Sequence, residues 1–255
     1  MTTLLNPIYL YSALTLSAVA FTLYCEYALA QSEDINSARC HRLWWRAAIG
    51  KTCASLGFIT LFLVLVNRAS PAELCAHPWW LGGALVTSAI GDLALIGKSQ
   101  RCFLVGLGSF LIAHLAFALA FMIPASQGMS LSQLSGGTPW LVTAGALAVT
   151  GLASAVAYRK FRPEMPESLR APSLVYSGVI ALMVATAAAH AYCTQCPYVT
   201  LGAIAFWLSD LAVAQQRFRG HLLPLQGFHV RLWGLPLYYI AQLILASEPS
   251  RYLGH

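Results

Sequence analysis

The sequence predicts an all-α fold, a polytopic bundle of eight transmembrane helices that forms one domain over residues 1–255. Charged residues are scarce: Lys, Arg, Asp and Glu make up 9% of the chain, whereas a soluble domain carries about 25%. The apolar residues also fall into long runs, which the amphipathic helices of soluble proteins lack. Because so few charges cannot cover a surface that faces water, we expect an integral membrane protein.

Eight apolar segments have the length that a helix needs to cross a bilayer, about 17 to 25 residues. The first is too long for a cleavable signal peptide, and no positive side chain precedes it. Prolines separate many of the segments, as at Pro71, Pro124, Pro172 and Pro224. The predicted spans are residues 7–30, 46–66, 79–97, 102–122, 139–158, 173–191, 197–215 and 232–248.

Positive residues are concentrated in the loops after the first, third, fifth and seventh spans. Twelve Lys and Arg residues lie there, whereas the other loops and the termini hold two, Arg68 and Arg251. Because cytoplasmic loops carry the excess of positive charge, we expect both termini to be non-cytoplasmic. This bias suits either a bacterial inner membrane or an endoplasmic reticulum, and the first is our expectation. We therefore attribute the net charge of +6 to residues that set the membrane topology, and we expect no nucleic-acid partner.

Ionisable side chains interrupt four of the apolar segments at a similar depth. Each costs about 2.5 to 3.5 kcal/mol at the centre of a membrane, so each is a candidate for function. With a rise of about 1.5 Å per residue, they lie within about 7 to 12 Å of the cytoplasmic boundary, together with two tyrosines. The residues of this layer are Glu26, Lys51, Asp92, Asp210, Tyr238 and Tyr239. His114 lies deeper, at about 20 Å. One polar layer with a histidine beneath it predicts a cavity that opens toward the cytoplasm.

Some of these residues have a simpler explanation. Lys51 and Glu26 have long side chains that could snorkel to the interface, and His114 could be an interhelical hydrogen bonder. Asp92 and Asp210 have side chains too short to reach water, which favours a functional role for both. Ser209 precedes Asp210 directly, and its hydroxyl could orient that carboxyl group.

Ordered motifs occur in four of the predicted spans. They are Gly91-Asp92, the run F-L-V-G-L-G-S-F-L-I-A-H-L that begins at Phe103, Leu201-Gly202-Ala203 with Phe206-Trp207-Leu208-Ser209-Asp210-Leu211-Ala212, and Tyr238-Tyr239-Ile240-Ala241-Gln242-Leu243-Ile244. Together with Tyr176 and Met183 between them, they resemble the lysoplasmalogenase-like (YhhN-type) membrane proteins from about Lys51 to Ala246. Two positions depart from the family pattern, since Thr52 stands in place of the usual Pro and Phe117 in place of the usual Tyr.

The resemblance implies an ether hydrolase that cleaves the vinyl ether bond of a lysophospholipid-type substrate, lysoplasmalogen, within the lipid bilayer. The products are a fatty aldehyde and glycerophosphocholine or glycerophosphoethanolamine. Protonation of the β carbon gives an oxocarbenium ion, which water then attacks. That chemistry needs a protonated carboxylic acid and a second carboxylate that activates water.

Our hypothesis from the sequence assigns Asp92 as the proton donor and Asp210 as the water-activating base. Other polar residues would orient the substrate or the water. They are Lys51, His114, Ser209, Tyr239, Gln242, Glu26, Tyr176 and Tyr238. The mechanism needs no metal, the sequence contains no metal-ligand cluster, and we expect no cofactor.

A second reading is a proton-coupled transporter or channel for a small polar or lipid solute, in which buried Asp, Lys and His form a relay. The confinement of the polar layer to one side argues against it. A third reading, a structural or receptor-like bundle, does not explain the paired carboxylates. The sequence leaves open the oligomeric state, the physiological substrate, and the redox state of Cys75, Cys193 and Cys196.

Overall fold

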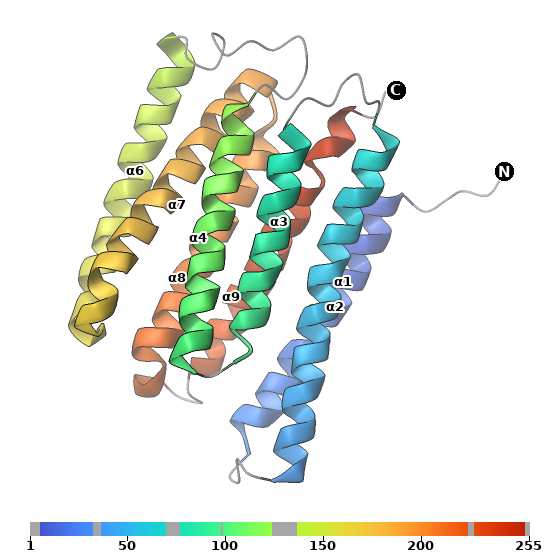
Figure 1. Ribbon diagram of the computed structural model, residues 1–255, viewed down its shortest axis with the longest axis vertical. Coiled ribbons are helices and arrows are strands. Elements are labelled where there is room, and N and C mark those ends of the chain that lie inside the picture. The colour runs from blue at the N-terminus through green and yellow to red at the C-terminus, as the bar shows by residue number, and fades with distance from the viewer. Residues whose placement is uncertain are drawn as a thin grey trace, which may run out of the picture.

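The structure of the protein is a computed structural model that describes residues 6–32, 37–69, 77–97, 99–123, 137–223 and 227–252. Within these ranges the chain forms eight long helices and three short 3-10 helices, and no strand (Figure 1). The long helices are α1 (Pro7–Ala30), α2 (Ala38–Arg68), α3 (His77–Ala94), α4 (Gln100–Met122), α6 (Gly137–Phe161), α7 (Glu167–Thr194), α8 (Pro197–Arg219) and α9 (Phe228–Ala246). The short ones are η1 (Arg162–Glu164), η2 (Gly220–Leu222) and η4 (Glu248–Tyr252). The predicted all-α class is confirmed, and each of the eight predicted segments coincides largely with one long helix.

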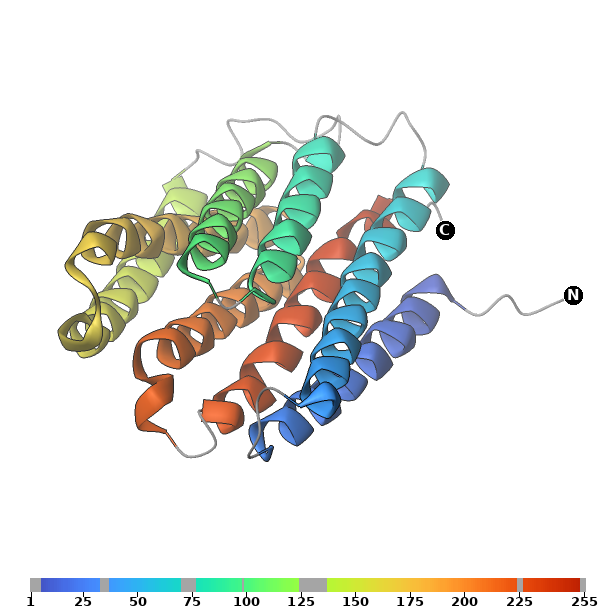
Figure 2. The same ribbon diagram turned by 60° about the horizontal axis from the view of Figure 1, so that its bottom comes forward.

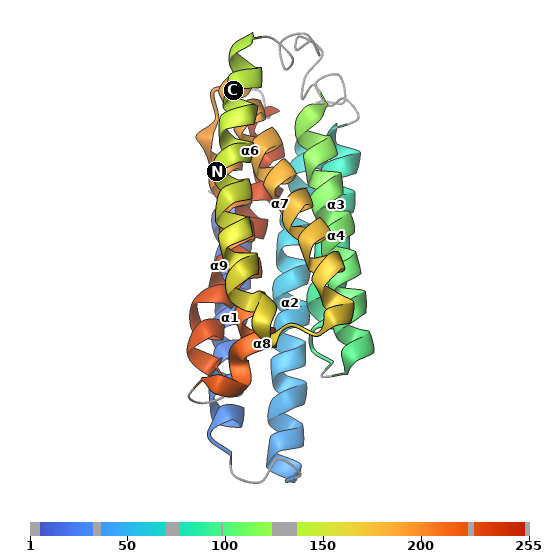
Figure 3. The same ribbon diagram turned by 90° about the vertical axis from the view of Figure 1, so that its left-hand side faces the viewer.

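Consecutive long helices run in opposite directions, and seven of them close a ring of contacts. The order around the ring is α1, α2, α3, α4, α7, α8 and α9, and α9 packs back against α1. In addition, α9 contacts α2 and α3, so it is enclosed by α1, α2, α3 and α8 (Figure 2). The eighth helix, α6, lies outside the ring and packs mainly on α7 and α8 (Figure 3).

One end of the bundle carries most of its positive side chains. At this end, the lower one in Figure 1, α1 joins α2, α3 joins α4, α6 joins α7 and α8 joins α9. Its positive residues are Arg39, Arg42, Arg46, Arg101, Arg159, Lys160, Arg162, Arg170, Arg217, Arg219 and Arg231. We call it the basic end. Lys98 and Cys75 lie outside the described residues. That the basic end faces the cytoplasm, with both termini on the other side, stays a prediction.

Among the described helices, six are long and apolar enough to cross a membrane: α1, α2, α4, α6, α7 and α8. The two others, α3 and α9, are the shortest of the eight, with 18 and 19 residues. Both belong to the contact ring, and they carry buried polar side chains such as Asp92 and Gln242. The chain is therefore a multi-pass membrane protein, and its two shortest long helices hold part of its polar interior.

Two helices, α2 and α7, begin six or more residues earlier than the sequence predicted. The predicted second span starts at residue 46, but α2 starts at Ala38, where the Ser37 hydroxyl accepts a hydrogen bond from the Cys40 amide at 3.2 Å. Its first turns are rich in Arg, so a search for apolar runs misses them. Pro172 was predicted to separate two spans, yet α7 begins at Glu167 and continues through it. The proline lies in the second turn, where it removes one backbone hydrogen bond without ending the helix.

Two glycines of α2 allow it to approach α1 closely. Gly57 faces the hydroxyl of Thr15, Gly50 faces that of Thr22, and both threonines are buried. A Cβ at either glycine would overlap the threonine oxygen. Small residues at such positions let membrane helices pack backbone to backbone.

Gly57→Leu should therefore lower the free energy of unfolding by about 1 to 3 kcal/mol, since the added side chain cannot enter this contact without moving α1. Thermal unfolding in detergent measures the change. The matched control is Gly151→Leu in α6, where a Cβ meets nothing within 4 Å. Equal stability of the two variants would contradict the proposed packing.

Candidate active site

Asp92 lies in the last turn of α3 and has a partner for each of its carboxylate oxygens. Lys51 Nζ of α2 lies 3.2 Å from Oδ1. The Tyr239 hydroxyl of α9 donates to Oδ2, and it also lies 3.1 Å from the Lys51 carbonyl oxygen and 3.4 Å from Ser55 Oγ. An ammonium group and a hydroxyl donor together compensate a buried negative charge. This environment is suited to an ionised Asp92.

Helical spacing brings these partners together. Lys51 and Ser55 are one turn apart on α2, so both face the same stretch of α9. On α3, Ser88 precedes Asp92 by one turn, and its carbonyl oxygen accepts a hydrogen bond from the Tyr238 hydroxyl at 3.0 Å. The adjacent tyrosines of α9 therefore hold that helix to α2 and α3 at the level of the carboxylate.

Asp210 lies on α8 with a different set of neighbours. The Tyr176 hydroxyl of α7 donates to Oδ2 at 3.0 Å. His114 Nε2 of α4 lies 3.1 Å from the same oxygen, off the line of a good hydrogen bond. The imidazole is fully buried. Its ring centroid lies 4.4 Å from that of Phe206 and 5.5 Å from that of Tyr176. The predicted deep histidine thus contacts one of the two predicted carboxylates directly.

The contacts of His114 fix the position of one of its ring protons. His114 Nδ1 lies 2.5 Å from the carbonyl oxygen of Phe110, one turn earlier on α4. A carbonyl oxygen only accepts hydrogen bonds, so Nδ1 carries a hydrogen. Nε2 then faces a carboxylate oxygen, and two lone pairs would repel each other there. One further proton, on Nε2 or on Asp210, would remove that repulsion.

Both aspartates line one large cavity, which we call the vestibule. Its volume is about 900 Å³, and it lies between the basic-end halves of α1, α2, α3, α8 and α9. Its polar lining includes Glu26, Lys51, Asp92, Ser209, Asp210 and Tyr238. Five of the six predicted polar-layer residues, three of them acids, therefore line a common space, as the depth argument predicted.

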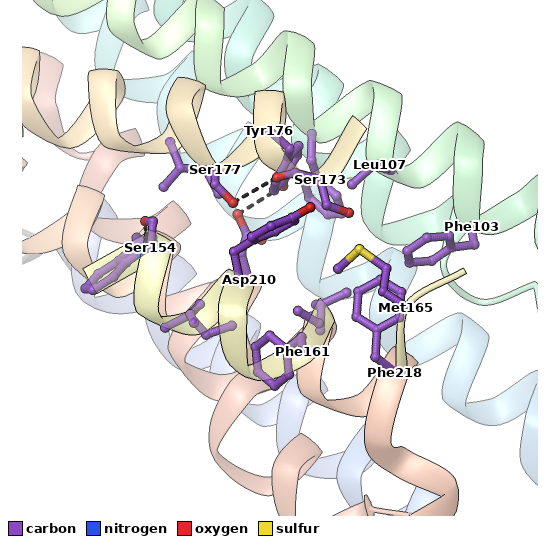
Figure 4. Close-up of a pocket in the computed structure, with 18 of the residues that line it drawn as sticks. Phe103, Leu107, Ser154, Phe161, Met165, Ser173, Tyr176, Ser177, Asp210 and Phe218 are labelled. Atoms are coloured by element: carbon purple, nitrogen blue, oxygen red, sulfur yellow. Dashed lines mark hydrogen bonds between the residues drawn. The ribbon is translucent and has the colours of Figure 1, made fainter. Parts of the chain in front are cut away.

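A second, smaller cavity adjoins Asp210 on its other side, and we call it the side chamber. It holds about 80 Å³ between α4, α6, α7 and α8, and its walls are mostly apolar and aromatic (Figure 4). Its polar side chains are Ser154, Ser173, Tyr176, Ser177 and Asp210. Figure 4 shows Asp210 beside Tyr176, with Phe103, Met165 and Phe218 further along the wall. Asp210 lines both cavities and is the point where they meet.

The remaining predicted residues lie in or near the site with varied contacts. Glu26 lines the vestibule and forms an ion pair with Arg231, with 3.6 Å between Oε2 and the guanidinium. The Ser209 hydroxyl donates to the Phe206 carbonyl of its own helix at 2.7 Å, so it does not orient Asp210. Gln242 is fully buried one turn from Tyr238, lines neither cavity, and its amide atoms have no hydrogen-bond partner among the described residues.

Sequence reasoning missed several residues that shape the site. Ser55 is an ordinary small residue of an apolar helix, and no local pattern distinguishes it. Arg217 and Arg231 were counted only as topology signals, although both line the vestibule. Within the described ranges, no group of three or more His, Cys, Asp and Glu side chains could hold a metal ion.

Comparison with known proteins agrees with the motifs. The model of the YhhN family matches residues 48–248. Two curated relatives, a lysoplasmalogenase of Mycobacterium bovis and one of Mycobacterium tuberculosis, are 31% identical over 169 residues. The match covers 64% of this chain and 59% of each relative, so the chain spans about three fifths of the length of the curated relatives it matches. No solved structure gives a match.

The matched region contains every helix that supplies the two carboxylates and their partners. It begins before Lys51 and ends after Tyr239, and it includes Asp92, His114 and Asp210. The family model also covers most of the chain. On this agreement of motifs, fold and family model, the chain belongs to the YhhN family.

Proposed function

We propose that the protein is an intramembrane hydrolase that cleaves the vinyl ether bond of lysoplasmalogen. The observation that carries this proposal is that Asp92 and Asp210 line one vestibule, each with different partners. The mycobacterial relatives are named lysoplasmalogenase, which supports the same reaction. The products are a fatty aldehyde and glycerophosphocholine or glycerophosphoethanolamine.

The contacts favour roles for the two aspartates opposite to those suggested by the sequence. The proton shared between His114 and Asp210 is available for the β carbon of the vinyl ether. Its transfer converts the double bond into an oxocarbenium ion with the positive charge on the ether carbon and oxygen. Asp92 has an ammonium partner, so it is suited to act as the base that takes a proton from the attacking water.

The reaction then closes with all atoms accounted for. Water adds to the oxocarbenium carbon and gives a hemiacetal, while its proton passes to Asp92. The hemiacetal collapses to the aldehyde when its hydroxyl proton returns to the Asp210–His114 pair and Asp92 gives its proton to the leaving glycerol oxygen. Both groups are then restored, and the net change is addition of one water. The negative charge of Asp92 faces the cavity in which the cation develops, and a fixed charge of opposite sign lowers the energy of that intermediate.

The two cavities suit the two ends of such a substrate. The side chamber is mostly apolar and adjoins Asp210, so it can receive the first carbons of the alkenyl chain. Each methylene group held there rather than in water is worth about 0.8 kcal/mol. The vestibule is more polar and opens at the basic end, so it can receive the glycerol and the head group.

One observation favours the second candidate, proton-coupled transport. A further buried pair lies at the end of the bundle opposite the basic end, where His190 Nε2 of α7 is 3.6 Å from Glu248 Oε1 of η4. A relay across the membrane would need ionisable groups at both ends. The two aspartates on one cavity nevertheless favour hydrolysis, because transport does not require them to share a cavity.

Purified protein in liposomes should release fatty aldehyde from lysoplasmalogen and none from the 1-O-alkyl analogue. The analogue has no double bond to protonate, so it controls for cleavage by any other route. Aldehyde is measured with a coupled dehydrogenase, and proton flux with a pH dye inside the liposomes. Solute-dependent proton flux without aldehyde would reject the hydrolase in favour of the transporter.

A further inference from the structure

The mouth of the vestibule contains side chains of both charges. Arg217 of α8, Arg231 of α9 and Glu26 of α1 line it. The Glu26 carboxylate lies 3.6 Å from the Arg231 guanidinium. Arg217 lies over the Phe103 ring, with 4.5 Å from its Cζ to the ring centroid. Trp44 of α2 completes this rim. Side chains of four helices thus surround the entrance with two cations, one anion and one indole ring.

The charges that line the vestibule do not cancel. Lys51, Arg217 and Arg231 contribute three positive charges, while Glu26 and Asp92 contribute two negative ones. In the proposed mechanism Asp210 and His114 share one proton, so this pair adds no net charge. One positive charge is left over, and it lies at the mouth because Lys51 is already paired with Asp92 at 3.2 Å. The mouth is therefore suited to one group with a single negative charge, such as a phosphodiester.

The spacing from Asp210 and Tyr238 to the two arginines fits such a ligand. Arg217 follows Asp210 by seven residues on α8, which is two turns along the same helix face, or about 10 Å. Arg231 and Tyr238 have the same separation on α9. In a lysoplasmalogen, seven bonds join the β carbon of the vinyl ether to the phosphorus atom. An extended chain advances about 1.2 Å per bond, which gives about 8.5 Å.

The anionic side of the rim suits the other half of a zwitterionic head group. Four more bonds, about 5 Å, separate the phosphorus from the ammonium nitrogen of choline or ethanolamine. A carboxylate and an aromatic face are the groups that recognise such ammonium ions, and Glu26 and Trp44 provide them. The pair between Glu26 and Arg231 is long at 3.6 Å, so a phosphate that attracts the arginine leaves the carboxylate for the ammonium.

We propose that the mouth of the vestibule is a binding site for the zwitterionic head group of a lysophospholipid. Arg217 and Arg231 bind the phosphodiester, and Glu26 and Trp44 bind the ammonium group. The assignment of the reacting end rests on the proposed function. The site selects phosphodiesters that carry an ammonium group over phosphate monoesters and over neutral alkylglycerols.

Binding of uncleavable ligands tests this site without depending on catalysis. The probes are 1-O-alkyl-glycerophosphoethanolamine, 1-O-alkyl-glycerophosphate and 1-O-alkylglycerol, which differ only in head group. Their dissociation constants are measured with the purified protein in detergent micelles. Arg217→Gln should weaken binding of both phosphate ligands about 10-fold and leave the alkylglycerol unchanged. Glu26→Gln should weaken only the ethanolamine ligand.

The matched control is Arg219→Gln, two residues further along α8. Arg219 lies 3.5 Å from Glu164 and does not line the vestibule. Equal effects of the two arginine substitutions, or equal affinity of the wild-type protein for the three probes, would overturn the proposal. Thermal unfolding of each variant confirms that it is folded. Specific binding of the ethanolamine probe without any cleavage of lysoplasmalogen would reject the proposed function and leave the head-group site standing.

Discussion

Asp92→Asn and Asp210→Asn should each reduce aldehyde release from lysoplasmalogen at least about 100-fold. Asparagine keeps the shape of each side chain but can neither hold the shared proton at Asp210 nor accept a proton from water at Asp92. General acid–base catalysis contributes about 10² to 10⁴ to the rate, and each variant removes one of the two roles. Single-turnover aldehyde release in detergent measures the loss.

The two variants need a control for the removal of an acid from this region of the protein. Glu164→Gln provides it, because Glu164 pairs with Arg219 and lines neither cavity. It should retain nearly full activity. Both aspartate variants should still bind the alkyl phosphoethanolamine probe. More than about a tenth of wild-type activity in either one would reject a mechanism in which two carboxyl groups share the proton transfers.

Lys51→Met should lower both stability and activity. The substitution keeps a long side chain but leaves the buried Asp92 without its positive partner at 3.2 Å. Breaking a buried pair on one side costs about 3 to 5 kcal/mol. The protein can avoid part of that cost by protonating Asp92, which then no longer acts as a base. We expect a lower melting temperature and a loss of activity of about 100-fold.

The double variant Lys51→Met, Asp92→Asn separates the two effects. It contains neither member of the ion pair, so it should recover much of the stability lost in Lys51→Met. Its activity should stay as low as that of Asp92→Asn alone. Lys51→Arg keeps the charge and should be less damaging than Lys51→Met. A double variant that is less stable than Lys51→Met would show that the lysine does not stabilise the protein through Asp92.

Much of the fold could be predicted from the sequence, because a membrane requires long apolar helices and the sequence displays each one. The residues at which the helices begin and end were harder to predict. Polar turns, such as the Arg-rich start of α2, extend a helix beyond the apolar run that reveals it. Pro172 could not be assigned either, since its effect depends on whether the preceding turn is already helical.

The site was predicted in part. Rise per residue placed the carboxylates at one depth, which is a property of single helices. It could not show that Lys51 and Tyr239 pair with Asp92, because that depends on how the helices are rotated against each other. Phe117, which stands where the family usually has a tyrosine, illustrates this dependence on helix rotation. Phe117 stacks with Phe121 and packs against Phe206, while Tyr176 of another helix donates to Asp210.

The position of α6 has a consequence for how the rate would depend on substrate. This helix forms part of the side-chamber wall through Ser154, Ala157, Tyr158 and Phe161, and it packs mainly on α7. It is the least buried of the six apolar helices, so this wall of the chamber lies nearest the hydrocarbon. A lipid that enters there keeps its tail in the leaflet throughout. Turnover would then follow the mole fraction of substrate among the membrane lipids, and adding inert lipid would slow the reaction at constant bulk concentration.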